Sequence, residues 1–334
     1  MKREVRTTLR DDGLKFFTLC KAMEVRGWLR DRAYSEYEKL LEMEISEKPL
    51  PEHIAIIMDG NRRYAKRIGI SVEGGYHYGA EITENVIEWC FDTGVKQLTV
   101  YAFSIENFCR TEDEKARLFA LMQDEFEKIC WDERVHKNGV RVKAIGDVNL
   151  LPESLQQTIK KAEQATEQYD KFKLFIAVAY SGRKEIVDSV RIITNMVKNG
   201  LLSVESIDEE TISKHLYVSE IENGSLTSTQ TAKTAVDLII RTGGEMRLSN
   251  FVPWQALGNE CAVYFCAPFW PEFRKIDLLR AIRTYQEREE EKRQHTIARV
   301  LKLNRFLHRK ALLKEQGNPS LEELLSKGFC EAKK

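Results

Sequence analysis

The stretch IAIIMDGNRRYAK, residues 54–66, joins an apolar run to a polar loop and the start of a helix. Its first five residues are all apolar, which is typical of a strand that is buried on both faces. Asp59 and Gly60 follow at once, and a glycine lets the backbone approach a ligand closely. Free N–H groups at the start of a helix attract anions. This stretch therefore predicts a buried strand that ends at an anion-binding site.

The rest of the chain continues this alternation of apolar runs and amphipathic stretches. Segments of helical period lie between most of the runs, as in Glu81–Thr93, Glu112–Cys130 and Glu153–Tyr169. The further apolar runs are LTVYAF (98–103), VRVKAI (140–145), KLFIAVAY (173–180), VDLIIR (236–241) and AVYFC (262–266). Strands that alternate with helices predict a parallel sheet with both faces covered. The predicted fold class is α/β, with a six-stranded, mainly parallel sheet flanked by helices.

Both ends of the chain are predicted to be helical. Apolar residues recur at near-helical spacing through residues 14–46, and charged stretches such as EREEEKRQ (287–294) follow Pro271. The segment 219–235 is rich in Ser, Thr and Gly, which predicts a flexible loop. We therefore predict a helical extension at 1–48, one α/β domain at 49–285 and a second helical extension at 286–334.

Composition excludes several classes of protein. Lysine plus arginine equal aspartate plus glutamate, 52 each, so we expect no nucleic-acid partner that depends on a general basic field. The seven cysteines are scattered without a CxxC pair, which favours reduced thiols in a cytoplasmic protein. No signal peptide or membrane span is expected. The aromatic-rich stripe of residues 14–46 packs either on the core or on a membrane surface, as a peripheral contact.

Three strand ends carry the polar residues, and ligands of open parallel sheets bind beyond the carboxyl ends of strands. At the first, Asp59 is a plausible magnesium ligand, because magnesium favours one or two carboxylates plus substrate phosphates. Arg63 can add a forked contact to a phosphate. The ordinary alternative is that Asp-Gly-Asn is a turn and a helix cap.

The second strand end is YAFSIENFCR, residues 101–110, whose hydroxyl, amide and guanidinium groups lie beside aromatic residues. It suits a phosphate on an apolar tail, or an ordinary capped helix. The third, DLIIRTGGEMRLSNF (237–251), sets two arginines and a serine around Gly243–Gly244, either as an anion cradle or as a solvated loop. No GxxxxGK[ST] is present, which argues against a P-loop nucleotide site. Together these segments predict a substrate with two diphosphates and apolar tails.

These segments, with WQALGNECAVYF (254–265) and FWPEF (269–273), closely resemble the signature blocks of undecaprenyl and dehydrodolichyl diphosphate synthases, the cis-prenyltransferase family. They occur in family order over residues 50–285, and the later blocks are most similar to archaeal members. The resemblance implies a magnesium-dependent prenyltransferase, usually a homodimer, with a hydrophobic tunnel for the growing chain. It would condense isopentenyl diphosphate with an allylic prenyl diphosphate, such as geranylgeranyl diphosphate, to a Z-polyprenyl diphosphate, the precursor of a glycosyl carrier lipid.

The family's functional residues carry over to matching positions. Asp59 matches the catalytic aspartate that organises magnesium and the diphosphates, and Glu260 matches a second magnesium carboxylate. Asn107 matches a catalytic asparagine often assigned a proton-handling role. Arg241, Arg247 and Ser249 match residues that hold isopentenyl diphosphate. The other matching substrate-binding positions are Gly60, Asn61, Arg62, Arg63, Tyr64, Ser104, Glu106, Phe108 and Arg110.

Three positions depart from the family's pattern. Val72 replaces a basic residue and Tyr76 replaces a histidine, both at substrate-binding positions. The family's C-terminal Arg-x-Gly is absent, and Glu291–Arg293 stands in its place. Two alternatives to ordinary elongation therefore stay open: prenyl coupling to a different acceptor, and an accessory subunit of a heteromeric enzyme. Neighbouring groups such as His77 and Arg67 can also compensate for the losses.

Overall fold

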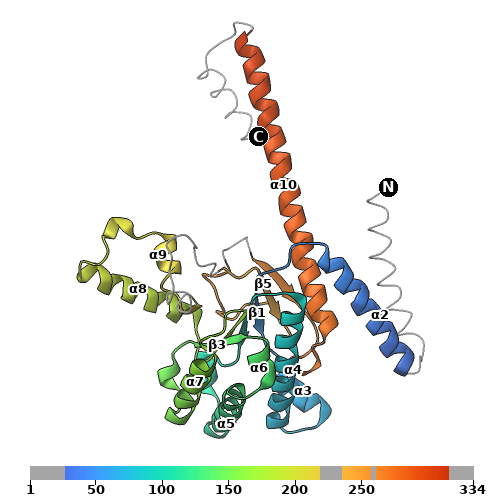
Figure 1. Ribbon diagram of the computed structural model, residues 1–334, viewed down its shortest axis with the longest axis vertical. Helices are drawn as coiled ribbons and strands as arrows, with labels where there is room; N and C mark the ends of the chain where they lie inside the picture. Colours follow the sequence, from blue (N-terminus) through green and yellow to red (C-terminus); the bar gives the residue numbers. More distant parts are fainter. Residues whose placement is uncertain (1–26, 219–234, 257–260, 316–334) are drawn as a thin grey trace. The chain divides into compact units, whose positions relative to one another are not determined.

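The computed structural model describes residues 27–218, 235–256 and 261–315, with uncertain parts drawn as a grey trace (Figure 1). The chain divides into two compact units, Met1–Gln286 and Glu287–Lys334. The first unit holds the sheet and the candidate site. The domain boundaries expected from the sequence stay a prediction.

The described part of the first unit contains a six-stranded sheet in the order β3-β4-β2-β1-β5-β6, and every pairing is parallel. The strands are β1 (His53–Ile57), β2 (Gln97–Tyr101), β3 (Val140–Ile145), β4 (Phe172–Ala177), β5 (Leu238–Arg241) and β6 (Ala262–Phe265). Each lies in one of the six predicted apolar runs, within a few residues at its ends. The predicted α/β fold is therefore confirmed.

Helices connect the strands and cover both faces of the sheet. They are α2 (Gly27–Ser46), α3 (Asn61–Ile68), α4 (Val72–Thr93), α5 (Glu112–Ile129), α6 (Glu133–Lys137), α7 (Glu153–Thr166), α8 (Gly182–Lys198), α9 (Glu209–Ser213) and α10 (Lys275–Glu315). Short 3₁₀ turns are η1 (Ile105–Cys109), η2 (Val148–Leu150), η3 (Val204–Ser206) and η5 (Trp270–Glu272). None of these described helices is both long and apolar enough to cross a membrane.

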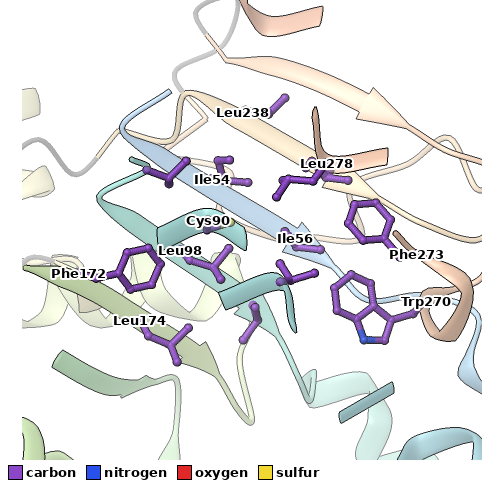
Figure 2. Packing of buried hydrophobic residues seen from close by; sticks show 14 of the residues in the cluster. Ile54, Ile56, Cys90, Leu98, Phe172, Leu174, Leu238, Trp270, Phe273 and Leu278 are labelled. Carbon is purple, nitrogen blue, oxygen red and sulfur yellow. The ribbon is translucent and has the colours of Figure 1, made fainter. Parts of the chain in front are cut away.

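Alternate residues of β1 enter two separate cores. Ile54 and Ile56 pack into the larger core with side chains from α4, α5, α7 and the start of α10 (Figure 2). Ala55 and Ile57 pack into a second core on the opposite face, which includes Phe251. β1 is apolar at every position after His53, and both of its faces are covered, as parallel sheets require.

Helix α2 places its apolar stripe on the larger core. Leu41 and Ile45 are almost fully buried, and Tyr34 and Tyr37 pack against the same cluster. The Gln286 side-chain amide also donates to the Ile45 carbonyl oxygen at 2.8 Å. Of the two alternatives for residues 14–46, core packing therefore holds for the described part of the stripe. Residues 14–26 lie outside the described ranges.

Two glycines let α4 approach the start of α3. A Cβ atom on Gly75 would lie 2.6 Å from the Asn61 carbonyl oxygen. On Gly79 it would lie 2.6 Å from Asn61 Oδ1 and 3.1 Å from the Trp270 ring. The Gly79 carbonyl oxygen also accepts a hydrogen bond from Trp270 Nε1 at 2.7 Å. These contacts therefore hold α4 against Asn61, at the start of α3, and against Trp270.

We expect Gly79→Ala to lower the free energy of unfolding by about 1–3 kcal/mol, because the added methyl group overpacks a closed contact. Urea denaturation followed by circular dichroism measures this. Gly74→Ala is the matched control on the same helix, because its Cβ would meet only side-chain atoms, Ile70 Cδ1 at 3.2 Å and Ser71 Oγ at 3.4 Å. The control is expected to be neutral or stabilising, since alanine favours helix by about 1 kcal/mol. Equal effects of the two variants would contradict the close-contact explanation.

Candidate active site

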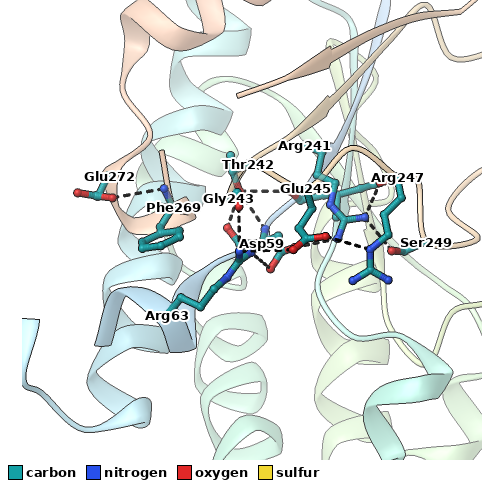
Figure 3. A network of polar contacts seen from close by, with 11 residues as sticks. Asp59, Arg63, Arg241, Thr242, Gly243, Glu245, Arg247, Ser249, Phe269 and Glu272 are labelled. Carbon is teal, nitrogen blue, oxygen red and sulfur yellow. Dashed lines mark hydrogen bonds and ion pairs between the residues drawn. The ribbon is translucent and has the colours of Figure 1, made fainter. Parts of the chain in front are cut away.

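Asp59 lies between two arginines at the carboxyl end of the sheet (Figure 3). Strands β1 and β5 pair so that Ile57 is opposite Arg241, which places Arg241 beside the loop after β1. Asp59 Oδ2 accepts a hydrogen bond from Arg241 Nη2 at 2.8 Å, and Oδ1 lies 3.0 Å from Arg63 Nη2. The predicted first and third segments therefore meet at this carboxylate.

The backbone around Asp59 is held as well as its side chain. Thr242 Oγ1 donates to the Asp59 carbonyl oxygen at 2.7 Å and accepts from the Asp59 N–H at 2.9 Å. The backbone N–H of Trp270 donates to the same carbonyl oxygen at 3.0 Å. Gly60, the next residue, has φ of 112°, and a Cβ there would lie 2.7 Å from the Phe269 ring. A glycine is therefore required where the chain turns into α3.

Arg241 is a buried guanidinium with a fixed orientation. The residue is only 3% exposed, and its Nη1 donates to Ser249 Oγ at 2.7 Å and to the Arg247 carbonyl oxygen. Its Nε has no hydrogen-bond partner among the described residues. A buried donor without a partner is costly, and such groups occur at sites that bind ligands.

The loop after Arg247 has a strained backbone. Ser249, Asn250 and Val252 have φ values of 48°, 59° and 42°, a region that is rare for residues other than glycine and costly for a β-branched one. The Asn250 side chain holds the loop to the start of α8, because its Nδ2 donates to Ser181 Oγ at 2.7 Å and its Oδ1 accepts from the Arg183 N–H at 3.0 Å. Strain that persists in this way keeps the Ser249 hydroxyl beside Arg241.

Arg63 and Arg247 present further positive charge in the same place. Arg63 donates to the Gly243 carbonyl oxygen at 2.9 Å, and its guanidinium lies 5.2 Å from the Phe269 ring centre. Glu245 stands between the two arginines, 3.7 Å from Arg63 Nη1 and 3.3 Å from Arg247 Nε. These side chains are largely exposed, so solvent screens the pairs and leaves the arginines available to another anion.

A second group lies where α3, α4 and α5 meet. The Tyr76 hydroxyl donates to Glu114 Oε1 at 2.6 Å and accepts from Arg110 Nη1 at 2.9 Å. Arg110 and Arg62 lie 3.3 Å and 3.8 Å from the same carboxylate. Burial and the hydrogen bond to Glu114 raise the pKa of Tyr76 well above its ordinary value, so the hydroxyl stays neutral. Burial also lowers the pKa of Arg110.

The second predicted strand end forms an ordered turn beside this group. Asn107 Oδ1 accepts from the Ser104 N–H at 3.1 Å, which fixes the orientation of the carboxamide. The Phe108 ring packs edge-on against the buried Phe103 ring, 5.0 Å between centres. Glu106 is exposed. The alternative of a capped helix start therefore also fits here, because the Asn107 side chain caps the N-terminus of η1 at Ser104.

The structure joins most of the predicted site residues but not all. Asn61, Arg62 and Arg63 open α3 and connect the two groups, whereas Val72 is 41% exposed at the start of α4. Tyr64 packs against Tyr78, with 5.9 Å between the ring centres, rather than against Asp59. The predicted second magnesium carboxylate, Glu260, lies outside the described residues.

Three residues of the site were missed from the sequence, namely Thr242, Glu245 and Glu114. Thr242 and Glu245 lie in the segment 237–251, between the predicted site residues Arg241 and Arg247. Glu114 carried one signal, its position four residues after Arg110, which favours an ion pair on a helix.

An apolar cavity extends from the site between α4, α5 and the sheet. Asn61 and Tyr76 line it where it meets the site, and Asn61 Oδ1 is buried there without a partner among the described residues. From Tyr76 to Phe91, α4 rises about 22 Å along the cavity wall. The apolar lining includes Ala80, Ile87, Phe91, Val100, Leu118, Leu121, Met122, Phe126, Ile129, Val140, Leu174 and Ile176.

One ion-pair cluster, which we call the Glu84 clasp, interrupts this lining. Glu84 on α4 accepts hydrogen bonds from Lys128 on α5 and from Arg134 on α6, the latter at 2.7 Å. Burial alone would raise the pKa of Glu84, but the two hydrogen bonds outweigh it and lower the pKa. The clasp therefore holds together three helices that enclose the cavity.

An arginine-rich site above an apolar cavity defines an enzyme class that binds diphosphates carrying apolar chains, the prenyltransferases. The Prenyltransf family model, which describes undecaprenyl diphosphate synthases, matches residues 57–293. The tritrans,polycis-undecaprenyl-diphosphate synthase (geranylgeranyl-diphosphate specific) of Methanosarcina mazei is 52% identical over 277 residues, 82% of this chain and 89% of the relative. The enzyme of the same description from Archaeoglobus fulgidus is 47% identical, over 76% of this chain and 96% of the relative.

Solved structures agree with the fold. The lavandulyl diphosphate synthase of Lavandula x intermedia, in complex with dimethylallyl diphosphate, matches with a TM-score of 0.62 and 33% sequence identity. The match covers 71% of this chain and 95% of that chain. The chain belongs to the undecaprenyl diphosphate synthase family of prenyltransferases, and the similarity to archaeal members noted in the sequence is confirmed.

We expect Tyr76→Phe to lower the free energy of unfolding by about 1–3 kcal/mol, because Arg110 and Glu114 each lose a hydrogen bond from a half-buried cluster. Urea denaturation measures the change. Tyr78→Phe, two residues along the same helix and 46% exposed, is the control and should stay within about 0.5 kcal/mol of the parent. An unchanged stability of Tyr76→Phe would show that the hydroxyl contributes nothing to the cluster.

Proposed function

We propose that this chain condenses isopentenyl diphosphate with an allylic prenyl diphosphate, geranylgeranyl diphosphate, to form a Z-polyprenyl diphosphate of undecaprenyl type. The observation that carries the proposal is that the arginine-rich site shares Asn61 and Tyr76 with the apolar cavity. The charged site would therefore bind the diphosphate head, and the adjoining apolar cavity would bind the prenyl tail. The two archaeal relatives are described as specific for geranylgeranyl diphosphate, which supports the same substrate.

The charge of the site suits two diphosphates. Five arginines gather against three carboxylates, and the arginines are Arg62, Arg63, Arg110, Arg241 and Arg247. Guanidinium groups bind phosphates through paired N–H donors, which makes arginine better suited than lysine. We assign Arg241, Arg247 and Ser249 to isopentenyl diphosphate, and Gly60, Asn61, Arg63 and Arg110 to the allylic diphosphate.

The residues present fit a magnesium ion that is shared with substrate. Asp59 is one carboxylate, partly exposed at 28%, with no cluster of three acidic, histidine or cysteine groups around it in the described ranges. Magnesium uses one or two carboxylates with substrate phosphates in this way. When bound, it would supply charge neutralisation of the diphosphate beside Asp59. Glu260 stays the proposed second ligand.

The residues then act by holding charge and geometry. Arg63 and Arg110 stabilise the negative charge that develops on the departing allylic diphosphate, the kind of electrostatic effect that is usually the largest in catalysis. The double bond of isopentenyl diphosphate attacks the allylic carbon, and a proton leaves to form the Z double bond. Asn107, whose carboxamide is fixed by Ser104, is proposed to assist that proton. Burial of the tail in the cavity contributes about 0.8 kcal/mol per CH₂.

Elongation is favoured over the two alternatives left open by the sequence. Relatives named as undecaprenyl-type synthases are 42–52% identical to this chain, above the 33% of the lavandulyl enzyme. The Tyr76 hydroxyl, moreover, fills the family's histidine position with a hydrogen bond to Arg110, so this departure does not empty the site. We infer a homodimer as the resemblance implies, and the cytoplasmic location stays a prediction.

We expect the purified protein alone to convert geranylgeranyl diphosphate and radiolabelled isopentenyl diphosphate into long Z-polyprenyl diphosphates, with magnesium required. Asp59→Asn should lower turnover roughly 10²–10³-fold, because one electrostatic stabiliser is lost while an acceptor oxygen remains for Arg241. Asp92→Asn, an exposed aspartate on α4, is the control and should keep full turnover.

Other outcomes of this assay point to other functions. Product from dimethylallyl diphosphate without isopentenyl diphosphate would favour a different acceptor. Incorporation that appears only after a second chain is added would favour a heteromeric enzyme. Full turnover by folded Asp59→Asn would place the reaction elsewhere.

Product length offers a separate test of the cavity. We expect Glu84→Ala to shift the products to longer chains, because removal of the clasp releases α4 from Lys128 and from Arg134, which keeps its pair with Asp132, and so loosens the wall between α4, α5 and α6. Thin-layer chromatography of the dephosphorylated products measures the distribution. Glu88→Ala, one turn further along α4, is the control, since Glu88 lines the cavity but is exposed. An unchanged distribution for Glu84→Ala would show that the clasp does not bound the product.

A further inference from the structure

The second unit carries a strongly asymmetric charge pattern. Four of the five residues 287–291 are glutamates, whereas residues 292–314 contain eight lysines and arginines and no aspartate or glutamate. The whole chain is electrically balanced, so this is a local basic segment rather than a general property. Apolar residues are interspersed throughout the segment.

Helix α10 gives this segment two chemically different surfaces. Ile297, Val300 and Leu301 recur at the spacing of one helix face, and all three are about half exposed. Leu303 and Phe306 are 56% and 62% exposed. In this unit the described apolar side chains therefore lie on the outside of a helix, where contact with water is unfavourable.

Arginine and lysine occupy an adjoining surface. Arg299, Lys302 and Arg305 recur every three residues and are exposed. No described side chain forms an ion pair with these three. By contrast, Lys292 and Arg293 lie 2.7 Å and 2.8 Å from glutamates of the preceding acidic stretch. Arg299, Lys302 and Arg305 are thus available to an external partner.

We propose that residues 297–306 of α10 bind the surface of a membrane that contains anionic lipids. Helices with an exposed apolar stripe and an adjoining basic surface lie in the plane of such membranes, with the stripe in the interface and the cations at the headgroups. This inference rests on α10 and does not depend on the proposed reaction.

Two other partners fit the surface less well. A second copy packed in parallel would bring two basic segments together, and like charges repel. An antiparallel copy would bring the acidic stretch, but Glu289 and Glu290 already pair with Lys292 and Arg293 of their own helix. A nucleic acid would pair with the cations but leave Ile297, Val300 and Leu301 in water. Anionic lipid satisfies both surfaces at once.

The test is flotation of the full-length protein with vesicles of phosphatidylcholine alone or of equal parts phosphatidylcholine and phosphatidylglycerol. We expect binding to the anionic vesicles only, and weaker binding at higher salt. The triple variant R299Q/K302Q/R305Q should lower the partition coefficient about a hundredfold, since three cations near the surface are lost. L301S should lower it by removing apolar contact.

The matched control removes three exposed lysines from α7 and α8, in the variant K160Q/K161Q/K198Q. It changes the net charge equally and should bind as the parent does. Equal loss in both triple variants, or equal binding to neutral vesicles, would overturn the proposal. So would a triple variant that keeps vesicle binding but loses self-association in light scattering, or a parent that binds duplex RNA and neither vesicle. Unchanged circular dichroism and turnover would show that each variant is folded.

Discussion

The pair between Asp59 and Arg241 is the contact on which the arrangement of the site depends. Arg241 is almost fully buried, and a buried cation is tolerated only when it is paired and hydrogen-bonded. The pairing register of β1 and β5 brings the two together across 182 residues of sequence. Removing one partner would leave an uncompensated charge, whereas a bound diphosphate adds a further counter-ion. The sheet thus holds a buried guanidinium at its carboxyl edge, where an anionic substrate can add a second negative partner.

The same part of the chain also joins the charged site to the cavity. Asn61 follows Gly60 at the start of α3, and the small residues Gly75 and Gly79 let α4 lie directly against it. Because α4 then forms the cavity wall, the helix that contacts the site is also the helix that lines the apolar interior. In the proposed function, the head and the tail of a prenyl diphosphate would both contact α4, so a change at this contact would affect both.

Local pattern was sufficient to predict the strands and insufficient to predict the site's contacts. The central strands β1 and β5 are almost continuously apolar, whereas the edge strand β3 alternates apolar residues with Arg141 and Lys143. Both patterns are typical of strands, so all six could be recognised from the sequence alone. Arg241 and Asp59 could be named, but not their pairing, because that follows from strand register. Glu114 was missed because its role arises where α4 packs on α5. The exposure of Val72 was likewise invisible, since it depends on where α4 begins. The proposed roles of Asn107 in proton transfer and of Glu260 in magnesium binding come from the resemblance to the family, because the geometry of the site does not assign them.

Tyr76 shows how a departure from the family's pattern can keep a site intact. Its single hydroxyl oxygen donates to Glu114 and accepts from Arg110, so one atom links an anion and a cation. The two ring nitrogens of a histidine are separate atoms, and its charge changes near neutral pH. Burial raises the pKa of Tyr76, so its hydroxyl keeps one charge state across that range. Where the resemblance implies a histidine, this chain therefore has a hydroxyl that stays neutral near neutral pH, and Arg110 keeps the same partner there.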